Sequence, residues 1–317
     1  MGGEWVGRAC ECDERRSRTI EAMPAALLML LSTLLFSTMS VTVKLASAIY
    51  GTGEIVFYRG LVGAAMIGVI ARCSRTSLRT AVPGMHVARG VSGVCALMLL
   101  FYAIGNLPLA TAVTLNYMSS IWMTMFLLGG AVLLGSARVD PRLVFTVLLG
   151  FAGVALVLRP TIEHNQLWHG LAGLLSGMLA ALAYLQVTAL GRAGEPELRV
   201  VFHFSLFTVA GGAAVAAFGG WHAHTPAGVL WLIATGVLAT LAQLLLTRAY
   251  AIGRPLVNAS LQYMGIVFSF GYGVWLFDDP VTSMALTGMT FIVAAGLAAT
   301  MLRRKAVAAA PVDSSQA

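Results

Sequence analysis

The chain has 317 residues, of which 58% are hydrophobic and only 10% are charged, whereas charged residues make up roughly a quarter of an ordinary soluble domain. A water-soluble fold of this length cannot bury so much apolar surface, so composition predicts an integral membrane protein. The formal net charge of +7 does not indicate nucleic-acid binding, because the basic residues lie near helix ends and form no stripe with interleaved aromatic residues.

Residues 1–22 form a polar segment before the first apolar run. They carry four arginines among five acidic residues, and we expect a cytoplasmic N-terminal tail. Met23 directly precedes the apolar run and offers an alternative start of translation. The run itself is too long for a signal-peptide core, so we expect it to remain as a membrane anchor.

Ten apolar runs follow, each about long enough to cross the roughly 30 Å of hydrocarbon in a bilayer. Backbone groups inside a bilayer need partners within their own segment, and the runs lack the alternation of barrel strands, so we predict helices. Residues 304–317 are expected to form a cytoplasmic C-terminal tail. The ten runs lie at 24–48, 54–71, 89–104, 109–134, 143–158, 170–190, 200–218, 228–250, 256–277 and 283–302.

The distribution of lysine and arginine predicts the orientation. If the N-terminus is cytoplasmic, almost all of the 20 basic residues fall in cytoplasmic segments. The exceptions are Arg159 in an outer loop, and Lys44 and Arg59 within or beside helices. Because cytoplasmic loops carry an excess of Lys and Arg, we expect both termini to be cytoplasmic.

Two stretches of the chain read almost alike. Tyr102-Ala-Ile-Gly105 is followed by Asn116-Tyr117, and Tyr250-Ala-Ile-Gly253 is followed by Gln262-Tyr263. Each half then holds five helices, and an odd number requires the halves to lie inverted in the membrane. The predicted fold is an all-α integral membrane protein with ten transmembrane helices in two inverted five-helix repeats. The repeats span 23–160 and 169–303.

Asn116, Tyr117, Gln262 and Tyr263 lie about eight residues into their runs, roughly 12 Å from opposite faces and therefore near the bilayer midplane. An amide is costly in lipid, so Asn116 and Gln262 must face protein or water. We predict that the four side chains contact a substrate. The alternatives are packing for the tyrosines and hydrogen bonds between helices for the amides. Further candidates for the cavity wall are Tyr184, Gln243 and Trp122.

Lys44, Glu54 and Arg59 lie at the outer end of the first helix pair. Ionisable side chains at membrane depth suggest function, and we expect a gating charge pair of Glu54 with Lys44 or Arg59. The alternative is that all three extend to the outer interface. Arg89, at the cytoplasmic start of the third run, is expected to be an interfacial anchor.

The remaining polar residues give no sign of enzyme chemistry. His222 and His224 lie in an outer loop without a third ligand, so no metal site is expected. Asp278 and Asp279 are expected to form a solvated turn in another outer loop. No HExxH, GxSxG or P-loop pattern occurs, so we expect neither an enzyme nor a bound cofactor.

Several motifs together resemble the EamA-like ten-helix carriers of the drug/metabolite transporter superfamily. The pattern includes Lys44 late in the first run, Phe57-Tyr-Arg59-Gly60 in the second, and Gly153 to Pro160 at the end of the first half. The repeated Tyr102–Gly105 and Tyr250–Gly253 stretches are similar to the ends of that family's third and eighth helices. The resemblance covers roughly residues 24–302.

The resemblance implies a central substrate cavity surrounded by helices 1, 3, 4, 6, 8 and 9. It also implies export or exchange of amino acids, amines or small metabolites across a bacterial inner membrane. One departure is that Gly135 is followed by Ser136, where family members often carry Gly-Glu.

We therefore expect a secondary transporter that works by alternating access, with a small molecule and the lipid bilayer as partners. A polytopic enzyme acting on a lipid-linked substrate and a channel are the alternatives. Gly60, Ala64 and Gly68 have the spacing of close helix contacts, either within the bundle or between the subunits of a homodimer.

Overall fold

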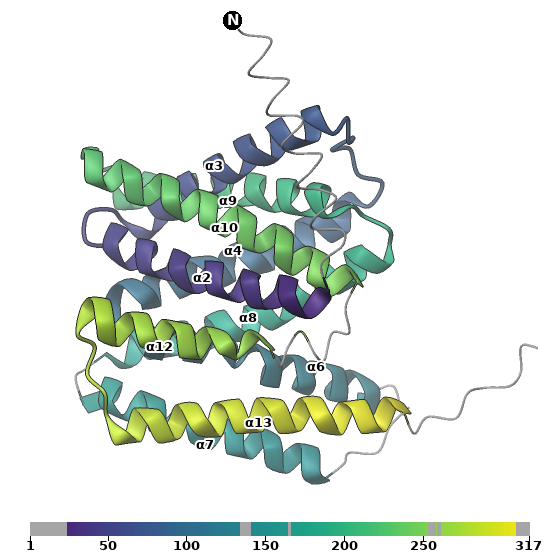
Figure 1. Cartoon of the computed structure of the whole chain (residues 1–317), viewed down its shortest axis with the longest axis vertical. Helices are drawn as coiled ribbons and strands as arrows, with labels where there is room; N and C mark the ends of the chain where they lie inside the picture. Colours follow the sequence, from purple (N-terminus) through teal and green to yellow (C-terminus); the bar gives the residue numbers. More distant parts are fainter. Residues whose placement is uncertain (1–23, 134–140, 164–165, 253–257, 259–260, 309–317) are drawn as a thin grey trace, which may run out of the picture.

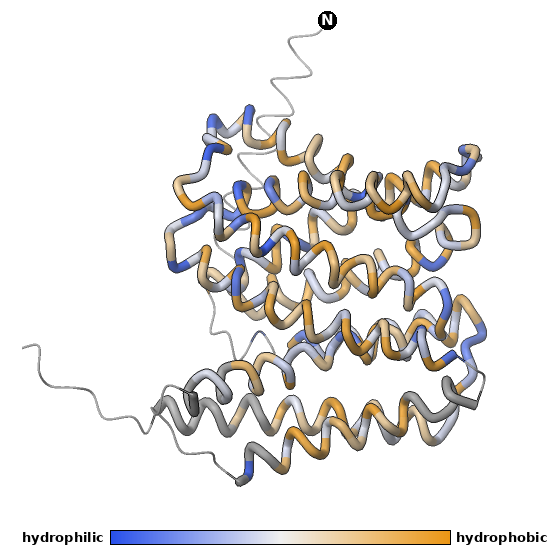
Figure 2. Tube along the Cα trace, turned by 180° about the vertical axis from the view of Figure 1, so that it is seen from behind, coloured by the Kyte–Doolittle hydropathy of each residue, from blue (hydrophilic) through white to orange (hydrophobic). Residues whose placement is uncertain are grey.

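The computed structural model describes residues 24–133, 141–163, 166–252, 258 and 261–308. In this part of the chain all regular elements are α-helices, packed side by side with their ends at two opposite faces (Figure 1). Figure 2 shows hydrophobic residues along the helices and hydrophilic residues mostly near their ends. The chain is thus a multi-pass membrane protein, as composition predicts. The predicted tail at 1–22 lies outside the described residues.

The first half contains a helix for each of the first five predicted runs. The fourth run contains two helices rather than one. The bounds are α2 Ala25–Ala46, α3 Thr52–Cys73, α4 Pro83–Asn106, α5 Leu109–Tyr117, α6 Ser119–Leu133 and α7 Pro141–Glu163.

The remaining described helices belong to the second half. The bounds are α8 Leu167–Arg192, α9 Glu197–Gly219, α10 Pro226–Ile252, α12 Met264–Phe277 and α13 Ser283–Ala308. Helix α13 extends to Ala308, so the first residues of the predicted C-terminal tail are helical. Residues 309–317, and the departure at Gly135-Ser136, lie outside the described residues.

Six of the described helices are long and apolar enough to cross a membrane, namely α2, α3, α4, α8, α9 and α10. Shorter apolar segments occur at Phe145–Val157, Met264–Phe277 and Ser283–Ala298. The six clear spans establish the membrane-protein class. The full count of ten spans remains a prediction.

The closest helix pairs join one half of the chain to the other. Helix α3 packs on α9, α2 on α10, α4 on α8, and α7 on α13. Gly60 permits the first contact, because a Cβ added there would lie 2.7 Å from the Val209 backbone nitrogen of α9. The small residue at position 60 therefore serves packing inside the bundle.

The predicted fourth span is interrupted at Met118. The Met118 amide donates to the carbonyl of Leu115, only three residues back, at 3.3 Å. In the second half α12 begins just after Tyr263, whose carbonyl accepts from the Ile266 amide at 3.0 Å. Both interruptions fall at the repeated amide–tyrosine pairs, so backbone irregularity coincides with the polar side chains in each half.

Candidate functional site

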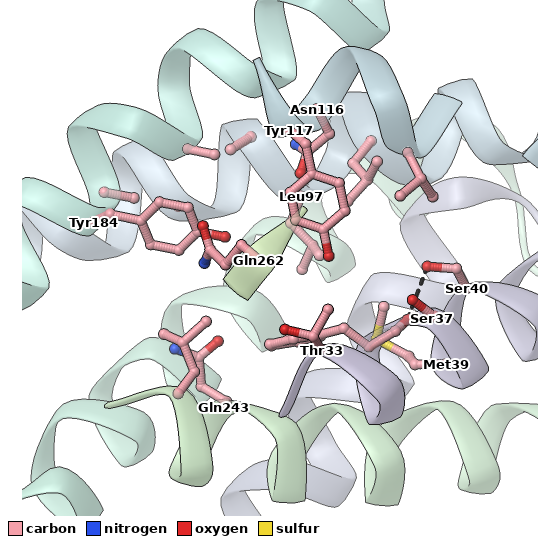
Figure 3. A pocket seen from close by; sticks show the side chains of 18 of the residues that line it. Thr33, Ser37, Met39, Ser40, Leu97, Asn116, Tyr117, Tyr184, Gln243 and Gln262 are labelled. Atoms are coloured by element: carbon pink, nitrogen blue, oxygen red, sulfur yellow. Dashed lines mark hydrogen bonds between the residues drawn. The ribbon is translucent and has the colours of Figure 1, made fainter. Parts of the chain in front are cut away.

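A cavity of about 100 Å³ lies at the centre of the bundle (Figure 3). Its walls come from both halves of the chain, because α2, α3, α4, α5, α8, α9, α10 and Gln262 all contribute. Helices α3 and α9 are additions to the set that the family resemblance implies. Its side chains with polar groups are Thr33, Ser37, Ser40, Arg59, Arg89, Asn116, Tyr117, Tyr184, Gln243 and Gln262.

Five of the predicted substrate-contacting residues line this cavity. Asn116 donates from Nδ2 to the Ser176 hydroxyl of α8 at 3.0 Å, which fixes its orientation. The Tyr117 ring projects into the cavity, and Tyr184 directs its hydroxyl at the Gln262 amide (Figure 3). Gln243 contributes from α10. Amides and hydroxyls from both halves thus face a shared space.

Tyr263 and Trp122 lie away from the cavity lining. Tyr263 is 4% exposed and packs against Gly296 of α13, where an added Cβ would overlap the tyrosine ring. Trp122 packs edge-on against Phe151, with ring centroids 5.3 Å apart. The helix continues through Tyr117 in the first half but restarts after Tyr263 in the second, so the two tyrosines point differently.

Arg59 and Arg89 line the cavity from α3 and α4. They are 6% and 4% exposed, and their guanidinium carbons lie 5.3 and 4.0 Å from the centre of the Phe204 ring. The expectation of an interfacial Arg89 is wrong. Helix α4 begins at Pro83 rather than at residue 89, which places Arg89 inside the bundle.

Lys44 forms an ion pair with the second half of the chain. Its Nζ lies 2.9 Å from Asp279 Oδ1, and the other carboxylate oxygen accepts from the Leu109 amide at 2.7 Å. The ammonium also lies 4.5 Å from the centre of the Phe277 ring. The Lys44–Asp279 cluster, meaning these two side chains and the Leu109 amide, therefore joins α2, α5 and the segment after α12. Asp279 is not the solvated turn residue that the sequence suggests.

Glu54 pairs with His222 rather than with Lys44 or Arg59. One carboxylate oxygen lies 2.6 Å from His222 Nδ1, and the other accepts from the His222 amide at 2.8 Å. The Gly51 amide donates a further hydrogen bond at 3.0 Å. These contacts explain how a carboxylate that is 1% exposed is satisfied at the start of α3. The three predicted gating charges therefore belong to three separate sites.

A second polar cluster lies between α8 and α9. Glu195 accepts hydrogen bonds from Thr80 and from Arg199 Nη1, and lies 3.3 Å from His86 Nε2. Arg199 also donates to the carbonyl of Ser77. Burial works to raise the pKa of Glu195, but the bonds from Thr80, His86 and Arg199 outweigh it and hold the pKa below its ordinary value. The cluster joins the α3–α4 and α8–α9 connections.

Comparisons with known proteins identify a family and several relatives. The model of the EamA-like transporter family matches residues 23–159. The chain is 34% identical over 278 residues to the pseudopaline exporter CntI of Pseudomonas aeruginosa, covering 86% of this chain and 94% of that protein. It is 28% identical over 237 residues to the riboflavin transporter of Rhizobium johnstonii, covering 73% of this chain and 75% of the relative.

A solved structure, titled only as the crystal structure of a protein, aligns with a TM-score of 0.61 at 21% identity. The alignment covers 89% of this chain and 98% of the solved one. At this identity the match shows the fold alone.

Proposed function

The chain belongs to the EamA-like transporter family, and we propose that it is a secondary transporter of a small organic metabolite. It exports or exchanges this compound across a bacterial inner membrane by alternating access. The observation that carries the proposal is the central cavity, whose amide and hydroxyl side chains come from both halves of the chain. A site at the interface of two repeats can be exposed to either side when the repeats rock.

The helix pairing supports two inverted repeats of five helices. Matching the halves in chain order relates α2 to α8 and α4 to α10. The pair α2–α10 then becomes α8–α4, which is also a close pair. Helices α3 and α9, and likewise α7 and α13, each pack on their own counterpart. This is the pattern of a pseudo-two-fold axis between the halves.

The interrupted helices support a substrate site at the midplane. Carriers with inverted repeats often bind substrates where helices are discontinuous, because irregular backbone there lines a cavity. Here both interruptions lie at the amide–tyrosine pairs, and Asn116, Tyr117 and Gln262 face the cavity. Substrate docks between them in this proposal.

The orientation that we propose from the basic residues puts the Lys44–Asp279 cluster at the outer face. Helix α2 begins and α13 ends on the same side of the bundle (Figure 1). Arg72, Arg192 and Arg248 are at or near helix ends on that side, so we assign it to the cytoplasm. The Lys44–Asp279 cluster then closes the cavity toward the outside, and it must separate when substrate leaves in that direction.

Counterflow in proteoliposomes tests the proposal. Labelled amino acids, amines, nucleosides and organic acids are offered to wild type, Tyr117→Leu and Tyr102→Leu. Tyr102 is the control, because it is 40% exposed and packs on His169 away from the cavity. We expect saturable exchange of one unmodified compound, reduced about tenfold by Tyr117→Leu alone, the loss of roughly 1.4 kcal/mol of binding.

Three results would count against it. Chemical conversion of the compound would indicate an enzyme, and unsaturable flux with conductance steps would indicate a channel. Exchange that is equal in wild type and Tyr117→Leu would leave a carrier with its site elsewhere.

A further inference from the structure

Two buried arginines in the cavity have no counter-charge in the described part of the chain. Arg59 and Arg89 come from different helices, yet both guanidinium groups stack on the Phe204 ring. The Nε atoms of both arginines and Nη1 of Arg89 are buried without a hydrogen-bond partner among the described residues. An aromatic ring attracts a cation but does not replace the oxygen acceptors that a guanidinium fork requires.

Four acids near the helix ends are committed to other partners. Glu54 pairs with His222, and Asp279 pairs with Lys44. Glu195 pairs with Arg199, and Glu197 pairs with Arg248. Within the described residues no carboxylate forms an ion pair with either cavity arginine.

Two like charges buried without partners are unfavourable for the empty protein. Retaining them at the cavity wall makes physical sense if a ligand supplies the missing acceptors. Arginine is suited to this role because its planar fork can bind a carboxylate or a phosphate through two parallel hydrogen bonds.

Gly93 makes room for this arrangement. It lies one turn after Arg89 on α4, and a Cβ added there would overlap Arg89 Nη1 and press on the Phe204 ring. Any larger residue at position 93 would therefore push the Arg89 guanidinium out of its present place. The glycine at position 93 thus leaves space for the Arg89 guanidinium to lie against the surface of α4.

We propose that the cavity binds a small organic anion, with its carboxylate or phosphate group held by Arg59 and Arg89. The uncharged part of the ligand then contacts the amides of Asn116, Gln243 and Gln262. This assignment rests on the proposed transport function and specifies its substrate class.

Thermal unfolding of the purified full-length protein measures binding without requiring transport, because a ligand that binds only the folded state raises the melting temperature. The probes are succinate, glutamate and citrate as carboxylates, and glycerol 3-phosphate and glucose 6-phosphate as phosphates. Succinamide, glutamine, glycerol and glucose are the matched uncharged compounds, and putrescine is the cation. The proteins are wild type, Arg59→Gln, Arg89→Gln and Arg192→Gln, a control at the exposed end of α8.

We expect at least one anion to raise the melting temperature while its uncharged counterpart does not. Its affinity should fall about tenfold or more in Arg59→Gln and Arg89→Gln and stay unchanged in Arg192→Gln. Comparing the melting temperatures with carboxylates and with phosphates shows which of the two groups the site prefers. If a glutamine variant fails to fold, Arg59→Lys and Arg89→Lys keep the charge but lose the fork, and weaker binding is expected from them as well.

The proposal is overturned if no anion of the panel raises the melting temperature, if an uncharged counterpart acts equally, or if the anion effect survives both arginine substitutions. Counterflow separates this failure from failure of the transport function. If neutral or cationic compounds are exchanged at the same rate in wild type and in both arginine variants, the transport function is supported and the anion site is refuted. If an anion binds but no compound is exchanged, the anion site is supported and the transport function is refuted.

Discussion

At the scale of single residues, the main tension in this molecule is between folding and binding at Arg59 and Arg89. Each arginine is almost fully buried and meets an aromatic ring instead of an acid. Burying an unpaired charge lowers stability, so we expect the two arginines to lower the unfolding free energy of the ligand-free protein. Functional sites often show this trade-off.

Replacing Arg59 by Met tests that tension. Methionine keeps much of the side-chain volume and removes the charge, so we expect the ligand-free protein to gain about 1–3 kcal/mol of unfolding free energy. Thermal unfolding in detergent at low anion concentration measures the change. Arg192→Gln, at an exposed position, should stay within about 0.5 kcal/mol of wild type. A clear loss of stability in Arg59→Met would mean that Arg59 serves the fold rather than a ligand.

Glu195 is expected to make the stability of the α3–α4 and α8–α9 connections depend on pH. Its pKa is lowered in the folded protein, so its stabilising contribution is present above the unfolded value of about 4.5 and is lost as the pH falls through the folded pKa. We expect Glu195→Gln to be less stable than wild type at neutral pH and to lose less on acidification. Melting temperatures measured from pH 7 to pH 3 check this.

Asp278→Asn is the matched control, because it removes one carboxylate from the opposite side at a left-handed position that asparagine tolerates. It should retain the acid-dependent loss. If Glu195→Gln and wild type lose stability in parallel, another group controls the acid response.

At the scale of helices, α8 approaches the backbone of α5 closely beside the interruption after Tyr117. A Cβ added at Gly177 would lie 2.8 Å from the backbone oxygens of Leu115 and Asn116. Because backbone atoms cannot rotate away, α8 would have to move. The same approach brings Ser176 into hydrogen-bonding distance of Asn116.

Gly177→Ala is therefore expected to destabilise the protein by about 1–3 kcal/mol and to weaken substrate exchange. Gly191→Ala in the same helix is the control, since a Cβ there has no atom within 4 Å. Alanine is the better helix former, so Gly191→Ala should be neutral or stabilised by up to about 1 kcal/mol. Equal melting temperatures for the two variants would show that α8 does not need this close contact.

Helix positions could largely be predicted from the sequence, whereas contacts between the halves could not. Asn116 and Gln262 were predictable cavity residues because polar amides are conspicuous inside apolar runs. The Lys44–Asp279 pair joins residues 235 positions apart, and no local pattern carries that information. A continuous fourth span was the natural prediction, since neither Gly nor Pro marks the interruption at Met118.

The position of Arg89 inside the bundle, in contrast, could have been predicted from the sequence. Pro83 is favourable at the first position of a helix, and an earlier helix start would have placed Arg89 inside the bundle. The divergent environments of Tyr117 and Tyr263 were beyond prediction, because near-identical sequence motifs adopt interruptions that differ by one residue.

At the scale of the whole molecule, the helix pairs, the cavity and the two polar clusters are all arranged around the interface between the two halves. The two halves pack through reciprocal helix pairs, and the cavity lies where they meet. The Lys44–Asp279 cluster joins three helical segments at the face assigned to the outside, and the Glu195 cluster joins two connections at the other face. Under the proposed alternating access, the two clusters would act as closures that open in turn rather than together.

Accessibility of a cavity cysteine tests alternating access most directly. Ser40 lines the cavity on α2 and is 5% exposed, so Ser40→Cys adds a small thiol there, in a background with Cys10, Cys12, Cys73 and Cys95 replaced by serine. A membrane-impermeant thiol reagent is then applied from the outer side of intact cells. We predict slow labelling while the Lys44–Asp279 cluster is intact, and labelling about tenfold faster in Asp279→Asn, which corresponds to roughly 1.4 kcal/mol in the closed–open equilibrium. Rapid labelling that is indifferent to Asp279 would contradict an outer closure and would indicate a cavity open to the outside, as in a channel.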